Sequence, residues 1–189
     1  MRPRLILVVP AGLAADRLAA ALAGGDVAAV MIPADAAEGR TLVSLAQGSG
    51  AAALVVGSGW PAPHGADGLH TDAEAVDRIR ARPAEATCGA RAINKHDAMM
   101  AGEAGADYLW FDGVDDLPAA AELAAWWQRV FEVPAVIAGP NDTASVTAMI
   151  ETGAEFVALV NAFGEEDDPR EIVARVNTAL DAAGADGTA

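Results

Sequence analysis

Short runs of apolar residues recur along the chain and predict a succession of buried strands. Eight such runs can be distinguished, and each is continuous rather than alternating with polar residues. A continuous apolar run is typical of a parallel strand, because helices cover both faces of a parallel sheet. The predicted strands are Leu5–Val9, Val27–Ile32, Ala52–Val56, Gly68–His70, Ala86–Gly89, Tyr108–Asp112, Ala135–Ala138 and Phe156–Val160.

Helical patterns separate the predicted strands. The last of them places Ile172, Val176 and Leu180 at the spacing of one face of an α-helix. Residues that can cap a helix N-terminus precede several of these patterns. The predicted starts are Thr71–Glu74, which has the spacing of a capping box, then Asn94, Asp142, and Asp168 with Pro169 in the first turn.

A short motif recurs where a helix ends and a strand begins. It consists of a glycine, then an acidic residue, then an apolar run, with the glycine at positions 25, 65, 105 and 153. Each glycine is placed to adopt a left-handed conformation just past a helix end. The intervals of 40, 40 and 48 residues each have room for two βα units, since one unit takes about 20 to 25 residues.

Eight strands in alternation with helices favour a small (β/α)8 barrel of the TIM type. An open, doubly wound sheet is the alternative, because such barrels usually have about 250 residues and this chain has 189. A barrel of this size needs trimmed loops. Residues 57–64 are too few and too rich in Pro and Gly for a full helix, so the third helix is expected to be one turn long or missing. We expect one domain over 1–183 and a disordered tail over 184–189.

The composition narrows the classes of partner. With 27 acidic and 12 basic residues the net charge is −15, and so negative a surface repels nucleic-acid phosphates and anionic lipids. The single cysteine, Cys88, excludes an internal disulfide or a cysteine-rich zinc site and is predicted to be buried. Because Pro10 and Gly12 interrupt the first apolar run, we interpret it as a strand rather than a secretion signal. No run reaches the ~18 apolar residues of a membrane span, so we expect a soluble, cytoplasmic protein.

In a barrel of this type, functional residues lie at the C-terminal ends of the strands. His70, Arg91 and Asp112 are the candidate catalytic side chains at these positions. Each also has a structural interpretation: His70 as a hydrogen-bonded, partly buried histidine, and Arg91 with Asp112 as an ion pair across the barrel mouth.

The turns after the seventh and eighth strands are candidates for binding a phosphate through backbone N–H groups. Pro140 removes one donor from the first of these turns. No HExxH or CxxC motif occurs, so no metal site is predicted from the residues. The predicted ligand or phosphate contacts are Arg91, Gly139, Asn141, Asn161 and Ala162.

Three segments resemble the thiamine-phosphate synthases and the related thiazole tautomerases, the TenI-like proteins. Gly65–His70 is similar to their GADGVHLGQ segment, and Cys88–Arg91 followed by Gly105–Tyr108 is similar to GxS…GADYxxFG. Val133–Gly139 and 153–162 are similar to IPVVAIGGI…GAxGVAVxSA. The resemblance extends over about residues 50 to 180. It implies a TIM barrel, a role in thiamine biosynthesis, and small phosphorylated ligands.

The chain departs from the family's catalytic pattern at several positions. Met31–Asp35 stands where the synthases hold pyrophosphate with a Gln-x-Arg-x-x-Lys element, and Gly57-Ser58 stands where Asn-Asp binds magnesium. Asp72 matches a second magnesium-binding aspartate only approximately, Arg91 replaces a serine, and 113–116 lacks the lysine of Thr-x-Thr-Lys. Release of pyrophosphate needs Mg²⁺ and cations to neutralise the leaving group. These replacements argue against synthase activity by the family's mechanism, and Mg²⁺ is implied only if the chain is a synthase.

Three functional hypotheses remain open. The first is a thiamine-phosphate-synthase-like protein that binds a small phosphorylated or anionic molecule at the barrel mouth through Arg91. The second is a genuine thiamine-phosphate synthase, a transferase that joins thiazole phosphate and pyrimidine pyrophosphate through altered contacts. The third is a non-enzymatic barrel that binds a protein partner. Trp126 and Trp127 are adjacent on a helix and cannot both point inward, so one of them is a candidate for an interface, including one between copies of the chain.

Overall fold

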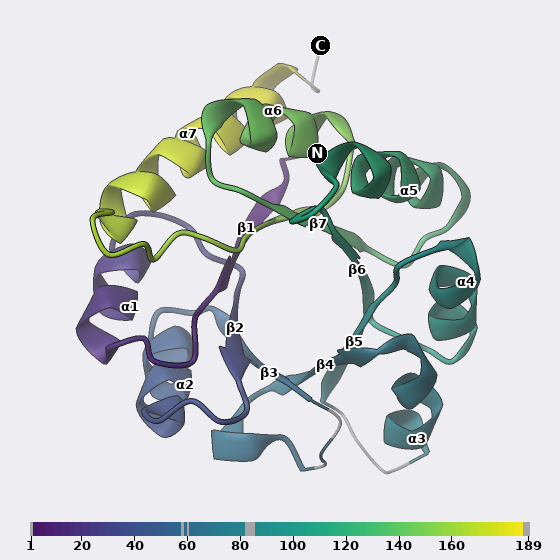
Figure 1. Ribbon diagram of the computed structural model, residues 1–189, viewed down its shortest axis with the longest axis horizontal. Coiled ribbons are helices and arrows are strands. Elements are labelled where there is room, and N and C mark those ends of the chain that lie inside the picture. The colour runs from purple at the N-terminus through teal and green to yellow at the C-terminus, as the bar shows by residue number, and fades with distance from the viewer. Residues whose placement is uncertain (1, 58, 60, 82–85, 187–189) are drawn as a thin grey trace.

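Each strand of the protein bonds in parallel to the next strand in the chain, and the first also pairs with the last. The protein is described by a computed structural model, which covers residues 2–57, 59, 61–81 and 86–186. Within these residues the sheet closes into a barrel ringed by helices (Figure 1). The predicted (β/α)8 barrel is therefore confirmed. The strands are β1 (Arg4–Val8), β2 (Ala29–Pro33), β3 (Ala52–Val56), β4 (Gly68–Asp72), β5 (Thr87–Arg91), β6 (Tyr108–Asp112), β7 (Ala135–Gly139) and β8 (Phe156–Leu159).

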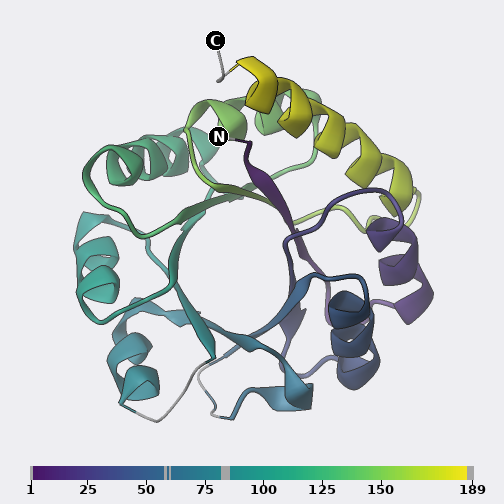
Figure 2. The same cartoon turned by 180° about the vertical axis from the view of Figure 1, so that it is seen from behind.

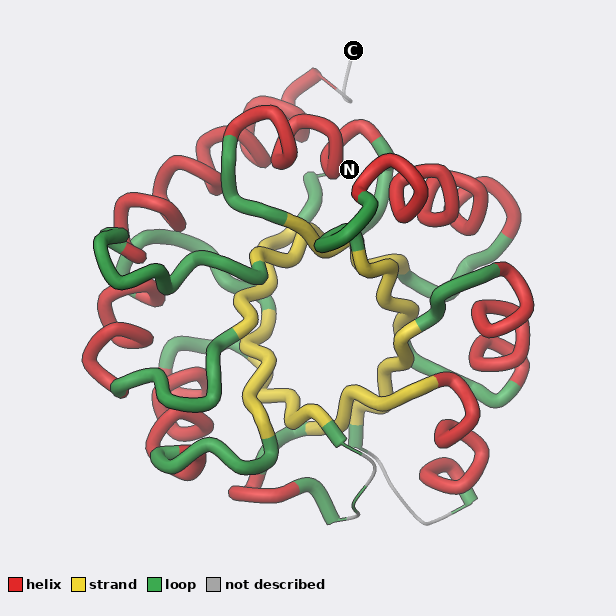
Figure 3. The backbone as a smooth tube through the Cα atoms, viewed as in Figure 1, coloured by secondary structure: helices red, strands yellow, loops and turns green. Residues whose placement is uncertain are grey.

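The helices surround the strands as an outer layer (Figure 3). Seen from behind, α7 runs along the outside of the barrel beside α1 (Figure 2). Between β3 and β4 the described residues contain only a single 3-10 turn, as expected for a shortened third helix. The helices are α1 (Ala15–Leu22), α2 (Gly39–Gly48), α3 (Val76–Arg80), α4 (Lys95–Glu103), α5 (Leu117–Val130), α6 (Thr143–Glu151) and α7 (Pro169–Asp186), with the 3-10 turns η1 (Pro63–Gly65) and η2 (Ala73–Ala75).

Four strands extend further towards the mouth than predicted, β2 and β7 by one residue and β4 and β5 by two. β4 continues to Asp72 and β5 to Arg91, because the ends of these strands pair with each other, with Asp72 opposite Arg91. The predicted capping box at Thr71–Glu74 is therefore wrong: Thr71 and Asp72 are strand residues, and the Asp72 side chain caps no N–H group. The chain passes through η2 before α3 begins at Val76.

The other predicted helix starts are confirmed by side-chain hydrogen bonds. Asn94 Oδ1 accepts from the backbone N–H of Asp97 at 2.9 Å, and Asp142 Oδ1 accepts from that of Ser145 at 3.0 Å. Asp168 Oδ1 accepts from Arg170 N at 2.9 Å. These bonds satisfy N–H groups that have no partner within the first turn of a helix.

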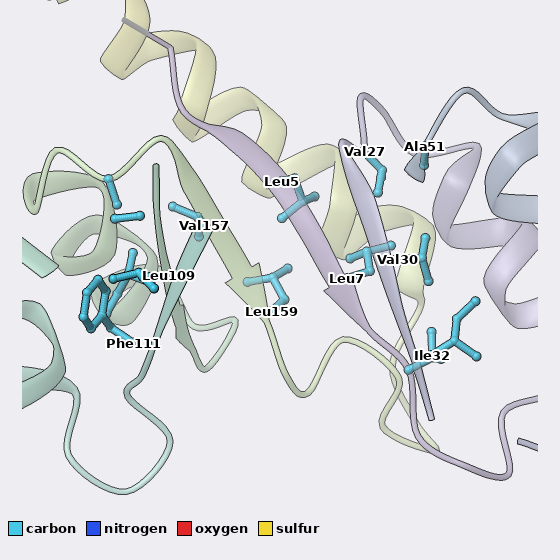
Figure 4. Packing of buried hydrophobic residues seen from close by; sticks show 14 of the residues in the cluster. Leu5, Leu7, Val27, Val30, Ile32, Ala51, Leu109, Phe111, Val157 and Leu159 are labelled. Atoms are coloured by element: carbon cyan, nitrogen blue, oxygen red, sulfur yellow. The ribbon is translucent and has the colours of Figure 1, made fainter. Parts of the chain in front are cut away.

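The core has two parts, separated by the strands themselves. Side chains such as Leu5, Leu7 and Val30 point away from the barrel axis and pack beneath the helices (Figure 4). Their neighbours along the strands point to the other face and fill the barrel interior. This inner cluster is smaller and consists of Ile6, Ala29, Met31, Leu54, Tyr108, Trp110, Val136, Ala138 and Ala158. Cys88 is fully buried in the outer part, as predicted.

Three of the four acidic residues of the repeated motif hold the starts of neighbouring strands, whereas the fourth, Asp26, pairs with Arg2 and Arg4. Asp67 Oδ2 accepts from the backbone N–H of Ala53 at 2.7 Å, and Asp107 Oδ2 accepts from that of Cys88 at 2.7 Å. Glu155 Oε2 accepts from Ala135 N at 2.9 Å. Each of these three carboxylates stands just before an even-numbered strand and bonds a peptide group at the start of the preceding odd-numbered strand. We call these three contacts the carboxylate clamps.

The glycines of the motif follow the prediction at three of the four positions. Gly65, Gly105 and Gly153 have φ values of 81°, 88° and 80°, which are left-handed conformations that favour glycine. The prediction is wrong for Gly25, which is not among the residues with positive φ. Glycine is needed there for space, because a Cβ on Gly25 would lie 2.7 Å from Asn177 Nδ2.

The C-terminal helix extends further than expected. α7 reaches Asp186, so residues 184–186 of the predicted tail are helical, whereas 187–189 lie outside the described residues. Among the helices that the structure describes, none combines the length and hydrophobicity needed to cross a bilayer. The cytoplasmic location stays a prediction.

Candidate functional site

A cavity of about 620 Å³ opens at the barrel mouth, where the C-terminal ends of the strands meet. Its walls combine apolar side chains with a small number of charged groups, which is the usual composition of a ligand site. The cavity is lined by Val8, Met31, Val56, Gly57, His70, Thr71, Asp72, Glu74, Ala75, Arg78, Arg91, Trp110, Asp112 and Val160. All three candidate catalytic residues, His70, Arg91 and Asp112, are among them.

His70 lies on the floor of this cavity and is held by aromatic neighbours. Its ring stacks on Tyr108, with centroids 5.8 Å apart, and lies 5.1 Å from the ring of Trp110. Its Nδ1 is 3.1 Å from the Tyr108 hydroxyl. Gly89 provides the space for this arrangement, because a Cβ there would lie 1.8 Å from Tyr108 Cζ. The floor therefore depends on a glycine in the middle of β5.

The environment of His70 keeps its imidazole neutral. Burial, and secondarily the positive charge of Arg91, lower the pKa of His70 to about 4. Burial also raises the pKa of Tyr108 well above its ordinary value. A general base works best with a pKa near the working pH, so at pH 7 His70 is a weak base and a neutral hydrogen-bonding group. This geometry agrees with the predicted structural role for His70.

Arg91 and Asp112 form the ion pair that was considered as their structural interpretation. Arg91 Nε lies 3.7 Å from Asp112 Oδ2, and the two side chains are 49% and 32% exposed. Asp112 also accepts the backbone N–H of Val114 through Oδ1, at 3.1 Å. Within the described residues the Nη groups of Arg91 have no hydrogen-bond partner. The pair therefore leaves the outer face of the guanidinium available to an anion.

Three further charged residues line the mouth and were not assigned to the site from the sequence. Asp72 lies opposite Arg91 in the β4–β5 register, while Glu74 and Arg78 come from η2 and α3. A helix that starts near Asp72 would place Arg78 in its second turn. Because α3 begins at Val76 instead, Arg78 is in its first turn, close to the strand ends. Arg78 could have been assigned to the site from the sequence if the end of β4 had been placed correctly.

The two turns predicted to bind phosphate are joined to each other. Asn141 N donates to Asn161 Oδ1 at 2.9 Å, and Asn141 Nδ2 donates to Asn161 O at 3.0 Å. Gly139 and Ala162 are buried. None of these four residues lines the cavity, to which this side of the barrel contributes Val160. The structure therefore does not bring them together with Arg91 around the cavity, and their phosphate role stays a prediction.

A family model described as thiamine monophosphate synthase matches residues 5–163 of the chain. The chain belongs to this family. A thiamine-phosphate synthase of Erythrobacter litoralis is 35% identical over 119 residues, which cover 54% of this chain and 54% of that protein. One of Rhodospirillum centenum is 34% identical over 109 residues, covering 50% and 51%. The chain thus matches these curated relatives over about half of their length.

Solved structures agree with the family's fold. Thiamine phosphate pyrophosphorylase from Pyrococcus furiosus superimposes with a TM-score of 0.83, covering 96% of this chain and 97% of that one, at 19% sequence identity. At that identity the likeness concerns the arrangement of strands and helices. The chemistry of this member of the thiamine monophosphate synthase family has to be argued from its own residues.

The magnesium site of the thiamine monophosphate synthase family does not fit the residues present here. Mg²⁺ prefers several oxygen ligands in near-octahedral geometry. Asp72, Glu74 and Asp112 line the cavity, but Asp112 already faces Arg91. Across the described residues, no group of three or more His, Cys, Asp or Glu side chains is placed to hold a metal ion. Of the family's Asn-Asp position, Gly57 offers no side-chain ligand, and Ser58 lies outside the described residues.

Proposed function

We propose that this protein binds a small phosphorylated or anionic molecule at the barrel mouth and does not follow the family's synthase mechanism. The observation that carries this proposal is the Arg91 guanidinium, whose Nη groups have no partner among the described residues and which lines a cavity with an aromatic floor. Arginine offers paired N–H donors that match the oxygens of phosphate or carboxylate. The apolar side chains of Val8, Met31 and Trp110 suit the uncharged part of the ligand.

The turns after β7 and β8 have a secondary place in this proposal. Asn161 is exposed and its backbone follows the last strand, where barrels of this type commonly bind phosphate. Asn141 already uses its N–H group in the bond to Asn161. A contribution from Asn141 N–H therefore requires the Asn141–Asn161 pair to open, whereas the pair engages only acceptor atoms of Asn161. Arg91 requires no such change.

Thermal shift measurements with thiazole phosphate, pyrimidine phosphates and inorganic phosphate test the proposal. A ligand of the native state raises the melting temperature in proportion to its occupancy. We expect at least one of these molecules to raise the melting temperature of the wild-type protein, and Arg91→Ala to remove the shift. Arg40→Ala is the matched control, because Arg40 is exposed in the first turn of α2 and does not line the cavity. No shift with any molecule would contradict the proposal.

Synthase activity is the second candidate, and the names of the relatives favour it. In that case the protein would join thiazole phosphate and pyrimidine pyrophosphate, with Mg²⁺ as cofactor, and Arg91 would replace part of the missing cationic contact. Complementation of a thiamine auxotroph decides between the two candidates. Growth supported by the wild-type chain establishes the synthase, and failure despite good expression excludes it.

A face formed by α4 and α5 supports self-association as an additional property. Trp127 is buried and donates through Nε1 to Val133 O at 2.7 Å. Trp126 is half-buried, and Lys95 Nζ lies over its ring, 4.8 Å from the ring centroid. Ile93 and Val130 on the same face are 68% and 60% exposed. Exposed apolar side chains grouped in this way are typical of protein interfaces.

The charges on this face suit a second copy of the chain. At the end near the mouth, α4 begins with Lys95 and α5 is preceded by Asp116; at the other end α4 finishes with Glu103 and α5 carries Arg129. This diagonal pattern is self-complementary under a two-fold axis along or across the helices. Light scattering on the wild-type protein and on Ile93→Asp with Val130→Asp tests it. We expect a dimer that the substitutions convert to a monomer, and a wild-type monomer at all concentrations would contradict it.

A further inference from the structure

We propose that the barrel mouth neutralises a dianionic phosphate with two arginines, Arg91 and Arg78, in place of a divalent metal ion. This inference rests on the proposed function and specifies the chemistry of the same cavity. Its starting point is the contrast between the family's magnesium and the charged groups that line this cavity. Those groups include two arginines, and they do not form a set of ligands for a metal among the described residues.

Arg78 is the first half of the proposed anion site. It lies in the first turn of α3, is exposed, and lines the cavity. In the part of the chain that the structure describes it makes no hydrogen bond and no ion pair. Arg80, two residues further on, is fully engaged, because it donates to Gly105 O at 2.9 Å and to Ala86 O at 3.2 Å and also pairs with Asp107. The two arginines of α3 therefore have different tasks, one structural and one open to a ligand.

Arg91 is the second half, and the fold places it on the same side of the mouth. α3 packs against β5, so the first turn of this helix is close to the strand end that carries Arg91. Asp112 holds Arg91 only through Nε, at 3.7 Å. Within the described residues its Nη groups have no hydrogen-bond partner, which leaves them available to an anion. Two guanidinium groups facing one cavity match the two charges of a phosphate monoester, which is dianionic above a pH of about 6.

The remaining carboxylates indicate what else the ligand carries. Asp72 and Glu74 line the same cavity and would repel a second anionic group. They can accept hydrogen bonds from hydroxyl or amino groups. The ligand class is therefore a phosphate monoester whose uncharged part carries such donors and rests against Trp110 and His70.

Calorimetric titration with inorganic phosphate and with thiazole phosphate tests the inference, each in EDTA and again in excess Mg²⁺. We expect the affinity of the wild-type protein for at least one of them to be the same in both buffers. Arg78→Ala should weaken binding by about tenfold or more, since a hydrogen bond to a charged group is lost. Arg78→Lys should restore part of the affinity. Arg40→Ala, which also removes one exposed arginine from the first turn of a helix, should leave it unchanged.

The outcomes separate this inference from the proposal on which it rests. Binding that requires Mg²⁺, or binding that Arg78→Ala leaves unchanged, overturns the two-arginine site while the proposed ligand class survives. If neither molecule binds the wild-type protein in either buffer, both fail together. Circular dichroism of each variant confirms that the barrel is intact, and Arg78 is suitable for substitution because it supports no other residue in the described structure.

Discussion

The charged side chains at the two ends of the barrel differ in how far they are engaged by partners. At the N-terminal end, Asp67, Asp107 and Glu155 each accept a backbone N–H from the start of a neighbouring strand. At the mouth, Arg78 has no partner within the described residues, and Arg91 has a single long contact. Charged groups that are fully engaged stabilise the fold, whereas groups left open are available for binding. We therefore expect the N-terminal end to contribute stability and the mouth to contribute binding, in keeping with barrels of this type.

The largest effect is expected at the aromatic floor that separates the two ends. In Gly89→Ala the new methyl group would overlap the buried Tyr108 ring. We expect the free energy of unfolding to fall by about 3 kcal/mol or more, from overpacking. Gly48→Ala is the control, because a Cβ there meets nothing within 4 Å. Urea denaturation measures both, and equal stability of the two variants would show that the floor is not tightly packed.

The next effect is a pH dependence that originates at the same floor. The pKa of His70 is about 4 in the folded protein and about 6.5 when unfolded, so the unfolded chain binds the proton more tightly. Stability is therefore fully present above pH 6.5 and is lost as the pH falls toward 4, by up to about 3 kcal/mol. His70→Gln should flatten this part of the stability profile, whereas Tyr108→Phe should keep it. Identical slopes for His70→Gln and the wild-type protein would contradict the assignment.

A matched pair of aspartates tests the comparison between the ends directly. Asp107→Ala removes the acceptor of Cys88 N and the partner of Arg80. We expect it to lower the free energy of unfolding by about 1 to 3 kcal/mol, because a strand N–H loses its bond. Asp112→Ala at the mouth should change it by less than about 0.5 kcal/mol. If the mouth variant were the less stable of the two in urea denaturation, the comparison would be reversed.

The smallest expected effect is a change in the pKa of the buried His70 imidazole when the charge of Arg91 is removed. Arg91→Ala removes a positive charge that contributes to the low pKa of His70, while the larger contribution, burial, remains. We expect the pKa of His70 to rise but to stay below that of an exposed histidine. An NMR titration of the imidazole measures this change, with Arg40→Ala as the unaffected control. An unchanged pKa of His70 would indicate that the Arg91 guanidinium lies further from His70 than it does in the structure.

The barrel could be predicted from the sequence because each strand is marked by a local pattern of residues. Continuous apolar runs and glycines at helix ends depend on neighbouring residues, and all eight strands were expected close to where they lie. The ends of β4 and β5 were less well predicted, because the pairing of Asp72 with Arg91 joins segments distant in the chain. The conformation of Gly25 was missed for the same reason, since it depends on contact with α7.

The candidate site was predictable only in part. Positions at strand ends correctly brought His70, Arg91 and Asp112 into one cavity. Arg78 was not predicted to line the cavity, because its position depends on the residue at which α3 begins. The bond between Asn141 and Asn161 joins two loops that sequence alone does not show to be in contact. Local pattern thus locates the mouth, while three-dimensional contacts decide which of its groups are free.

The carboxylate clamps also predict where the chain can be cut into two fragments that still assemble. Each clamp joins one strand to the next, so three pairs of strands, β3–β4, β5–β6 and β7–β8, are each held together by a contact of their own. A cut in the loop after Asp112 leaves every clamp within a single fragment, whereas a cut inside α4 separates Asp107 from Cys88. The first pair of fragments should reassemble when mixed, and the second should do so much less readily.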